Sequence, residues 1–210
     1  MRSTNENGAG QEGHAPRAVC WDRISQGYAS SSHAAEACKA LGLPTQDLHR
    51  AWTYCGREGD VAAVRFRYMN RGATWKRCAF MHHGVWSTTP RMVPLFGLEC
   101  LEPGKASLCI GAPWESEEAW WVRKEAMQGR DWVPTIDAED TCAWLRWKGA
   151  NAVACLQAPD VSDGLTDWTP LAGRPIQFIP HRSHEARAAM DRVWSLLEGL
   201  GCTLWKGGRA

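Results

Sequence analysis

The sequence predicts an α/β protein with a mostly parallel sheet flanked by helices and a small β-rich lobe on its N-terminal side. Two observations lead to this prediction. After Pro103-Gly104, short apolar runs alternate with segments of helical periodicity, which is typical of successive βα units. Before that point, residues 61–81 show the alternating side chains and the central turn residues of a β-hairpin.

The chain begins with a segment that is poor in apolar side chains. Residues 1–17 are rich in Gly, Asn and Ser, so we expect a disordered tail. A short helix is expected over residues 30–43, because Ser32 can cap its start and Gly42 lies near its end. Residues 18–103 are predicted to form the small N-terminal lobe, of which this helix is the first element.

The hairpin of this lobe carries much of the positive charge of the chain. Its strands are expected at 61–69 and 74–81, joined by the turn signal Asn70-Arg71-Gly72. Arg65 and Arg67 are two residues apart, so they lie on one face of the first strand. The second strand adds Lys76 and Arg77, and the aromatic residues Tyr68, Trp75 and Phe80 lie close enough for base stacking.

Charge is distributed unevenly along the chain, although its formal net charge is only +1. From Arg50 to Arg91 there are eight basic residues and two acidic ones, whereas acids dominate from Glu99 to Asp140. A basic lobe beside an acidic domain favours contact between the hairpin and phosphates. We therefore predict nucleic-acid contacts from Arg65, Arg67, Arg71, Lys76 and Arg77. The alternative is a solvated hairpin face that needs no ligand.

The second part of the chain, residues 104–206, is predicted to form the α/β domain. Its apolar runs predict strands at 108–110, 132–136, 152–156 and 176–179, and its periodic segments predict helices at 116–127, 140–148 and 185–200. The tryptophans of these helices are expected to pack in the core or between subdomains. They are Trp120, Trp121, Trp144, Trp147 and Trp194. Trp168, ahead of the last strand, is expected to be structural.

Composition excludes several classes of protein. At 210 residues with 44% hydrophobic side chains, the chain can bury a substantial core. It contains no run of about 20 apolar residues and no charged-then-apolar signal segment, so no membrane association is expected. Nine cysteines, odd in number and without Cys-x-x-Cys pairs, argue against a disulfide framework. We therefore expect a cytoplasmic protein.

The turn after the last predicted strand concentrates the polar side chains of this region. Strand 176–179 lies between Pro175 and Pro180, and the helix begins near Glu185. The residues between them include His181, Arg182, Ser183 and His184. Since ligands and catalytic groups of open α/β sheets lie at the carboxyl ends of the strands, this turn is a candidate site.

This segment resembles the last motif of TOPRIM domains, the metal-binding fold of DNA primases, topoisomerases and some nucleases. Ala172-Gly173-Arg174, the strand, Pro180 and Arg187 match the branch that is common on plasmids and phages. Residues 167–174 resemble its "DWSPLAGR" segment, and residues 90–98 resemble its "PRPLYGL" segment. The resemblance covers roughly residues 51–201. It implies a nucleic-acid-binding scaffold to which Arg174, Arg182 and Arg187 contribute.

The chain departs from this family where the chemistry would lie. His181 and Ser183 replace the two aspartates that would bind magnesium. The strand followed by Glu-Gly-Glu has two candidate positions. At 107–113 the glutamate position is Gly111, and at 134–141 Asp137 would replace the glutamate. The first position has the expected order along the chain, the second retains acids, and the sequence does not decide between them.

Three chemical interpretations follow. In the first, Asp137, Glu139, Asp140 and His181 are the catalytic residues of a metal-dependent primase or nuclease. In the second, a softer metal such as manganese or zinc binds to His181 and His184 with an acid, either Glu185 or Asp137.

In the third and preferred interpretation, the metal has been lost. The turn then contacts phosphate directly, through His181, Arg182 and His184 at the start of the last helix.

A further zinc site from His14, Cys20, His33 and Cys38 matches no compact zinc spacing.

The sequence thus predicts a catalytically degenerate, TOPRIM-like and primase-related protein of a mobile element that binds nucleic acid. A replication or helicase protein is a candidate partner. Two alternatives remain: a metal-dependent DNA primase or nuclease with a non-standard Asp/Glu/His site, and a protein-interaction module that binds no nucleic acid.

Overall fold

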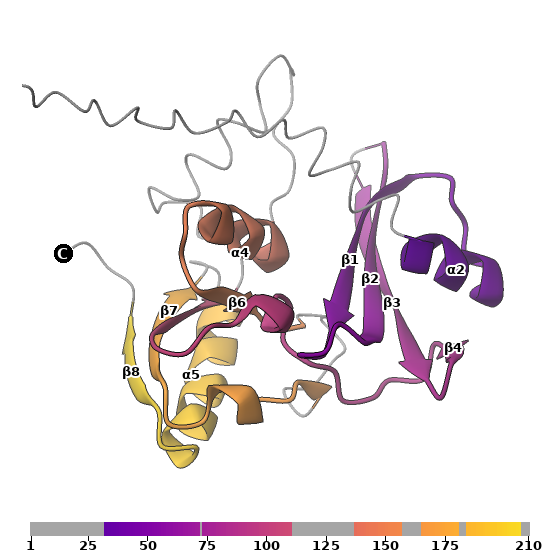
Figure 1. The fold of residues 1–210 in the computed structure, drawn as a ribbon. Helices are drawn as coiled ribbons and strands as arrows, with labels where there is room; N and C mark the ends of the chain where they lie inside the picture. Colours follow the sequence, from indigo (N-terminus) through magenta and orange to yellow (C-terminus); the bar gives the residue numbers. More distant parts are fainter. Residues whose placement is uncertain (1–31, 72, 111–136, 157–164, 181–183, 207–210) are drawn as a thin grey trace, which may run out of the picture.

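The computed structural model describes residues 32–71, 73–110, 137–156, 165–180 and 184–206. The side chains of residues 147, 180, 184–187 and 189 are not part of this description. The expected tail at 1–17, the helix at 116–127 and the strand at 132–136 lie outside the described residues. Within them, the protein is a mixed α/β structure with one antiparallel and one parallel sheet, each of four strands (Figure 1).

The antiparallel sheet contains the predicted hairpin. Its strands are β1 (Leu48–Cys55), β2 (Val61–Asn70), β3 (Ala73–His82) and β4 (Val85–Ser87), in that order across the sheet. β2 and β3 pair without interruption from Ala63–Phe80 to Asn70–Ala73. Arg71, in the turn between them, has a φ of 46°, a left-handed conformation that tight turns require. The predicted helix is present as α2 (Ser32–Leu41).

The two faces of this sheet have different neighbours. Side chains alternate along a strand, so Val64, Phe66 and Tyr68 of β2 lie on one face. They pack against Ala34, Ala37 and Cys38 of α2 in one apolar cluster. Arg65 and Arg67 lie on the opposite face and are also buried, at 1% and 0% exposure. β2 is therefore buried on both faces, and its second face carries charge.

The parallel sheet has the order β6-β5-β7-β8. Its strands are β5 (Ala106–Ile110), β6 (Ala152–Ala154), β7 (Pro175–Pro180) and β8 (Thr203–Lys206), and every pairing is parallel. The described helices of this part are α4 (Ala138–Trp147), α5 (His184–Gly199) and the short 3-10 helices η1 (Leu98–Cys100) and η3 (Thr169–Leu171). The strands predicted at 108–110, 152–156 and 176–179 and the helices predicted at 140–148 and 185–200 are thus present.

Helices cover both faces of the parallel sheet. Cys109 and Ile179 share an apolar cluster with Cys142 and Leu145 of α4. Their neighbours along the same strands, Leu108 and Phe178, instead share a cluster with the α5 residues Met190, Val193 and Leu197. Because these neighbours point to opposite faces, α4 and α5 lie on opposite sides of the sheet. The three layers are those of a doubly wound α/β domain.

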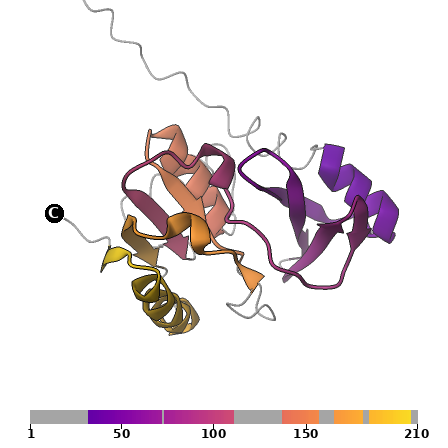
Figure 2. The ribbon, with the colours of Figure 1, turned by 60° about the horizontal axis from the view of Figure 1, so that its bottom comes forward.

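The two sheets share one apolar core. Trp52, Tyr54 and Phe80 of the antiparallel sheet belong to the same cluster as the α4 face of the parallel sheet. In Figure 2, α2 lies on the outer side of the antiparallel sheet, away from the parallel one. The segment before β5 reinforces the junction, since Val93 pairs with Thr166 and Phe96 with Ala154 in isolated bridges. The α4 face thus sets how the two sheets meet.

Three strands were not expected from the sequence. In β1, the buried face carries Arg50 beside Trp52 and Tyr54, so the strand lacks a simple apolar alternation. β4 and β8 are only three and four residues long, too short for a periodicity to be recognised. Among the described residues, no helix is long and apolar enough to cross a membrane. The eight cysteines within them are all free thiols.

Candidate functional site

The start of α4 presents three acidic side chains to the junction between the sheets. Asp137 precedes the helix, Glu139 and Asp140 lie in its first turn, and all three are buried. The backbone N–H of Asp137 donates to Oδ2 of Asp140 over 3.0 Å, which closes half of a capping box. Negative charge is favourable here because the N-terminus of a helix carries partial positive charge.

These acids lie towards the carboxyl edge of the parallel sheet. α4 leads directly into β6, and a helix that connects two parallel strands runs antiparallel to them. The first turn of α4 therefore faces the edge at which β5 and β7 end. The sequence located its candidate chemistry at this edge, and the structure places Asp137, Glu139 and Asp140 together there.

The antiparallel sheet presents basic side chains to the same place. Arg67 of β2 pairs in register with Arg50 of β1 and with Lys76 of β3, which forms a row of three bases across three strands. Arg65 lies in the next row, beside Trp52. Like charges directly opposite each other destabilise a sheet, so this row requires compensation from outside it.

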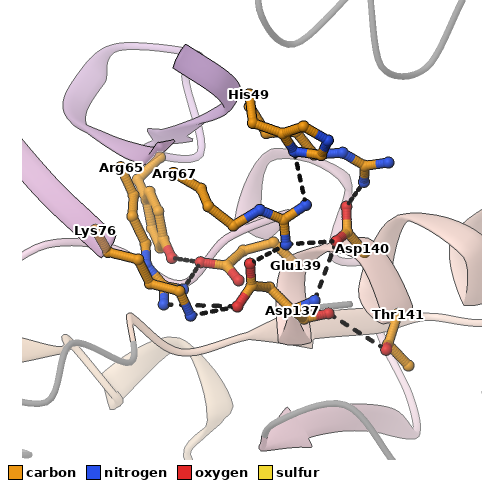
Figure 3. Close-up of polar contacts among 10 residues, drawn as sticks. His49, Arg65, Arg67, Lys76, Asp137, Glu139, Asp140 and Thr141 are labelled. Atoms are coloured by element: carbon orange, nitrogen blue, oxygen red, sulfur yellow. Dashed lines mark hydrogen bonds and ion pairs between the residues drawn. The ribbon is translucent and has the colours of Figure 1, made fainter. Parts of the chain in front are cut away.

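The acids of α4 supply that compensation (Figure 3). Nη1 of Arg67 donates to Oδ2 of Asp137 over 2.6 Å, and Nζ of Lys76 donates to the other oxygen of the same carboxylate. Arg50 donates to Oδ1 of Asp140. Asp140 also lies 3.7 Å from Nη1 of Arg67, so it is shared between two strands.

Glu139 holds the deepest position of the cluster, at 0% exposure. Its Oε1 accepts hydrogen bonds from Arg65 and from the hydroxyl of Tyr54, the latter over 2.6 Å. Its Oε2 is buried and has no hydrogen-bond partner. The guanidinium carbons of Arg65 and Arg67 lie 5.7 Å and 5.3 Å from the ring centroid of Trp52, which adds a cation–π contact.

The protonation of these groups follows from their mutual contacts. Burial favours the neutral form of Asp137, but Arg65, Arg67 and Lys76 outweigh it and lower the pKa of this carboxyl. Burial likewise opposes the charge of Arg65, yet Glu139, Tyr54 and Asp137 raise its pKa above the ordinary value. Burial and the neighbouring Glu139 raise the pKa of Tyr54 well above its ordinary value, so its hydroxyl remains a donor.

The ionic cluster, as we call Arg50, Tyr54, Arg65, Arg67, Lys76, Asp137, Glu139 and Asp140, contains four basic and three acidic side chains. Its formal charge is therefore one positive. A divalent cation would have to displace guanidinium groups from the acids and enter a site that is already positive. Among the described residues, no group of three or more His, Cys, Asp or Glu side chains has the arrangement of a metal site.

The predicted nucleic-acid contacts separate into two groups in the structure. Arg65 and Arg67 are buried in the ionic cluster, and Lys76, with a side chain 26% exposed, is bound to Asp137. Arg71 and Arg77 are exposed, on the turn and on the α2 side of β3. Arg174 is half-buried, and its Nε donates to the carbonyl of Pro170 over 3.0 Å.

The turn after β7 is only partly described. β5 and β7 are neighbours whose ends pair at Ile110 and Pro180. Gly111, from the first candidate Glu-Gly-Glu position, and His181 therefore follow adjacent strands. Residues 181–183 lie outside the described residues, as do the side chains of His184, Glu185 and Arg187. The metal set His181, His184 and Glu185 and the contact from Arg182 therefore remain predictions.

Sequence reasoning did not single out two members of the ionic cluster and one neighbouring histidine. Arg50 and Tyr54 contribute from β1, and His49 Nδ1 lies 3.1 Å from Nη2 of Arg67. The alternation of Arg50, Trp52 and Tyr54 in a segment rich in β-forming residues was the available signal for this strand.

The other candidates have structural roles where they are described. Trp144 and Trp168 are buried, and Trp194 stacks on Phe178 with ring centroids 5.0 Å apart. In the candidate zinc set, Cys38 of α2 is buried against the antiparallel sheet. His33 lies 3.7 Å from the carboxylate of Glu36. His14 and Cys20 lie outside the described residues.

The fold and the site define a two-sheet α/β protein whose sheets are joined by an apolar core and a buried ionic cluster. No protein-family model, no curated protein and no solved structure matches this chain.

Proposed function

We propose that this chain is a TOPRIM-like, primase-related protein that has lost metal-dependent catalysis and binds nucleic acid. Its setting would be the cytoplasmic replication of a mobile element, together with a replication protein as partner. The parallel sheet with helices on both faces is compatible with such a scaffold. The motif resemblance at residues 90–98 and 167–174 is what favours TOPRIM over other α/β folds.

The observation that carries the loss of catalysis is the pairing of the acids with buried bases. In a metal-dependent enzyme, carboxylates must be available to hold the ion through their oxygens. Here Asp137, Glu139 and Asp140 each accept a charged hydrogen bond from the antiparallel sheet. Acids that are already paired with bases stabilise the junction of the sheets, and they offer magnesium little affinity.

Nucleic-acid binding is supported by the bases that the ionic cluster does not use. Arg71 and Arg77 are exposed, and no ion pair of either is found among the described residues. From Val61 to Leu98 the sequence contains no aspartate or glutamate. The hairpin therefore carries positive charge with no acid of its own. Asp47 lies beside its turn, where it accepts a hydrogen bond from Asn70 over 2.8 Å. The excess of bases favours a polyanionic ligand.

The test combines a metal titration with a nucleic-acid titration. We expect no calorimetric binding of magnesium or manganese at millimolar concentration. We expect fluorescein-labelled oligonucleotides to bind, with an affinity that falls as salt rises. Arg71→Ala and Arg77→Ala should each weaken binding and reduce the slope of log K against log salt by about 1.

Lys206→Gln is the matched control, because it removes one exposed positive charge from β8 in the other sheet. It should leave affinity and slope unchanged. Magnesium binding that Asp137→Asn abolishes would contradict the loss of metal chemistry. If none of the oligonucleotides binds at low salt, the proposed nucleic-acid binding is contradicted.

A further inference from the structure

One exposed aromatic side chain differs from the other exposed apolar residues. Trp75, Val85, Met92 and Leu196 are the large apolar side chains exposed among the described residues. Only Trp75 is held against a second ring, with its centroid 5.5 Å from that of Tyr68 and an angle of 7° between the planes. Tyr68 is itself fully buried. The indole thus has one covered face, and its 37% exposure comes from the other face and the edges.

The other two aromatic residues that the sequence indicated for base stacking cannot take this role. Tyr68 is 0% exposed and Phe80 is 2% exposed, so neither offers a ring face to solvent. The structure therefore selects Trp75 from the three aromatic residues that the sequence indicated for base stacking.

The strand that carries Trp75 has an open edge. β3 pairs with β2 from Ala73 to Phe80, but it pairs with β4 only from Phe80 to His82. Among the described residues, no strand covers the outer edge of residues 73–79. An extended ligand can therefore approach Trp75 along this edge without displacing part of the sheet.

Positive charge accompanies the exposed ring. Arg77 is two residues from Trp75, on the same face of β3 and about 7 Å away along the strand. Arg77 also acts on Tyr68. Burial and Cys38 raise the pKa of Tyr68, and the positive charge of Arg77 partly lowers it again. Arg71 lies in the turn at the end of the strand. A flat ring with a guanidinium beside it is the combination that binds a base and its phosphate.

These features distinguish between kinds of nucleic acid. A base can stack on Trp75 only when its own face is accessible, and duplex bases hide their faces in the helix. We propose that Trp75 is a stacking platform for single-stranded nucleic acid, with Arg77 and Arg71 holding the adjacent phosphates. This inference rests on the proposed nucleic-acid binding and names its substrate class.

The experiment compares three fluorescein-labelled probes at several salt concentrations: a 20-nucleotide oligothymidine, a 20-base-pair duplex and an abasic oligonucleotide of the same length. Trp75→Ala should weaken binding of the oligothymidine about 5- to 150-fold, the range for loss of one stacked base. Its salt slope should not change, because no phosphate contact is removed. Trp75→Phe should retain most of the affinity, and the abasic probe should not distinguish wild type from Trp75→Ala.

Leu196→Ala is the control, since Leu196 has the same 37% exposure but lies on α5. It should leave all affinities unchanged, and urea midpoints should show that each variant is folded. The stacking proposal is wrong if the oligothymidine binds Trp75→Ala and wild type with equal affinity. It is also wrong if wild type binds the duplex more tightly than the oligothymidine. In both cases the proposed nucleic-acid binding still holds. If no probe binds, the proposed function fails as well. If Trp75→Ala alters only self-association, the open edge pairs copies of the chain instead.

Discussion

Among single residues, the ionic cluster pairs side chains for which the sequence predicted two different roles. Arg65 and Arg67 have the sequence features of phosphate ligands, and Asp137, Glu139 and Asp140 have those of metal ligands. Each group is instead the partner of the other. Buried charges are tolerated only when they are paired and hydrogen-bonded, and here the bases of one sheet satisfy the acids beside the other.

The lowered pKa of Asp137 predicts how stability depends on pH. A carboxyl whose pKa is depressed in the folded state contributes stability above its ordinary pKa of 3.8. That contribution is lost as pH falls through the lower folded value. Urea unfolding between pH 7 and pH 3 should therefore show a steep loss of stability below about pH 4. Asp137→Asn should be less stable at pH 7 and should lose less on acidification.

Asp191→Asn provides the comparison, because Asp191 is exposed on α5. Its pH profile should follow that of the wild type. Profiles of wild type and Asp137→Asn that run parallel would show that Asp137 does not contribute in this way.

At the scale of elements, short connections fix how the segment before β5 packs against the parallel sheet. Gly97 precedes η1 with a φ of 80°, next to the bridge between Phe96 and Ala154. A Cβ at this position would lie 2.7 Å from Nη1 of Arg146 and 3.3 Å from the carbonyl oxygen of Ala152. The left-handed conformation therefore favours glycine here, and a Cβ would also crowd the carbonyl oxygen of Ala152, whereas the end of the flexible Arg146 side chain can move.

Two glycine substitutions separate these effects. Gly59 has a φ of 83° but open space around its Cβ position, so Gly59→Ala should cost only the conformational strain of about 1–2 kcal/mol. Gly97→Ala should add the cost of overpacking, about 1–3 kcal/mol more. Urea denaturation measures both free energies of unfolding. Equal losses would mean that Arg146 and the backbone at Ala152 adjust without cost.

At the scale of the whole molecule, the apolar core and the ionic cluster join two sheets into one unit. Trp52, Tyr54 and Phe80 pack with the α4 face of the parallel sheet, and the ionic cluster lies in the same junction. Since removing one partner from a buried ion pair leaves the other charge uncompensated, the junction should be the most sensitive part of the fold to charge removal.

Arg67→Met tests this coupling, because Arg67 is 0% exposed and contacts both Asp137 and Asp140. We expect a loss of about 3–5 kcal/mol in unfolding free energy. In native-state hydrogen exchange, the central amides of β2 and β5 should open with one shared free energy in the wild type and with separate ones in the variant. Arg77→Met, at an exposed position of β3, should change stability by less than about 0.5 kcal/mol. Shared opening in Arg67→Met would mean that the apolar core alone couples the sheets.

The elements whose periodicity is local could be predicted from the amino-acid sequence. The alternation of β2 and β3, the apolar run between Pro175 and Pro180 and the helical spacing of α5 are properties of neighbouring residues, and all four elements are present. The switch after Pro103-Gly104 likewise predicted the parallel sheet. β1 was not predicted, because the charged residue Arg50 is buried in it and interrupts the apolar alternation.

Which charged residues meet could not be predicted in this way, because it depends on the packing of distant segments. Arg67 and Asp137 are 70 positions apart, so no local pattern indicates that they meet. Burial and ion pairing depend on which faces of distant segments pack together, and that packing assigned Arg65 and Arg67 to the junction while it left Arg71, Trp75 and Arg77 exposed. The sequence thus carried the periodicity and the charge, whereas the contact between the two sheets determined which charges are neutralised inside and which face solvent.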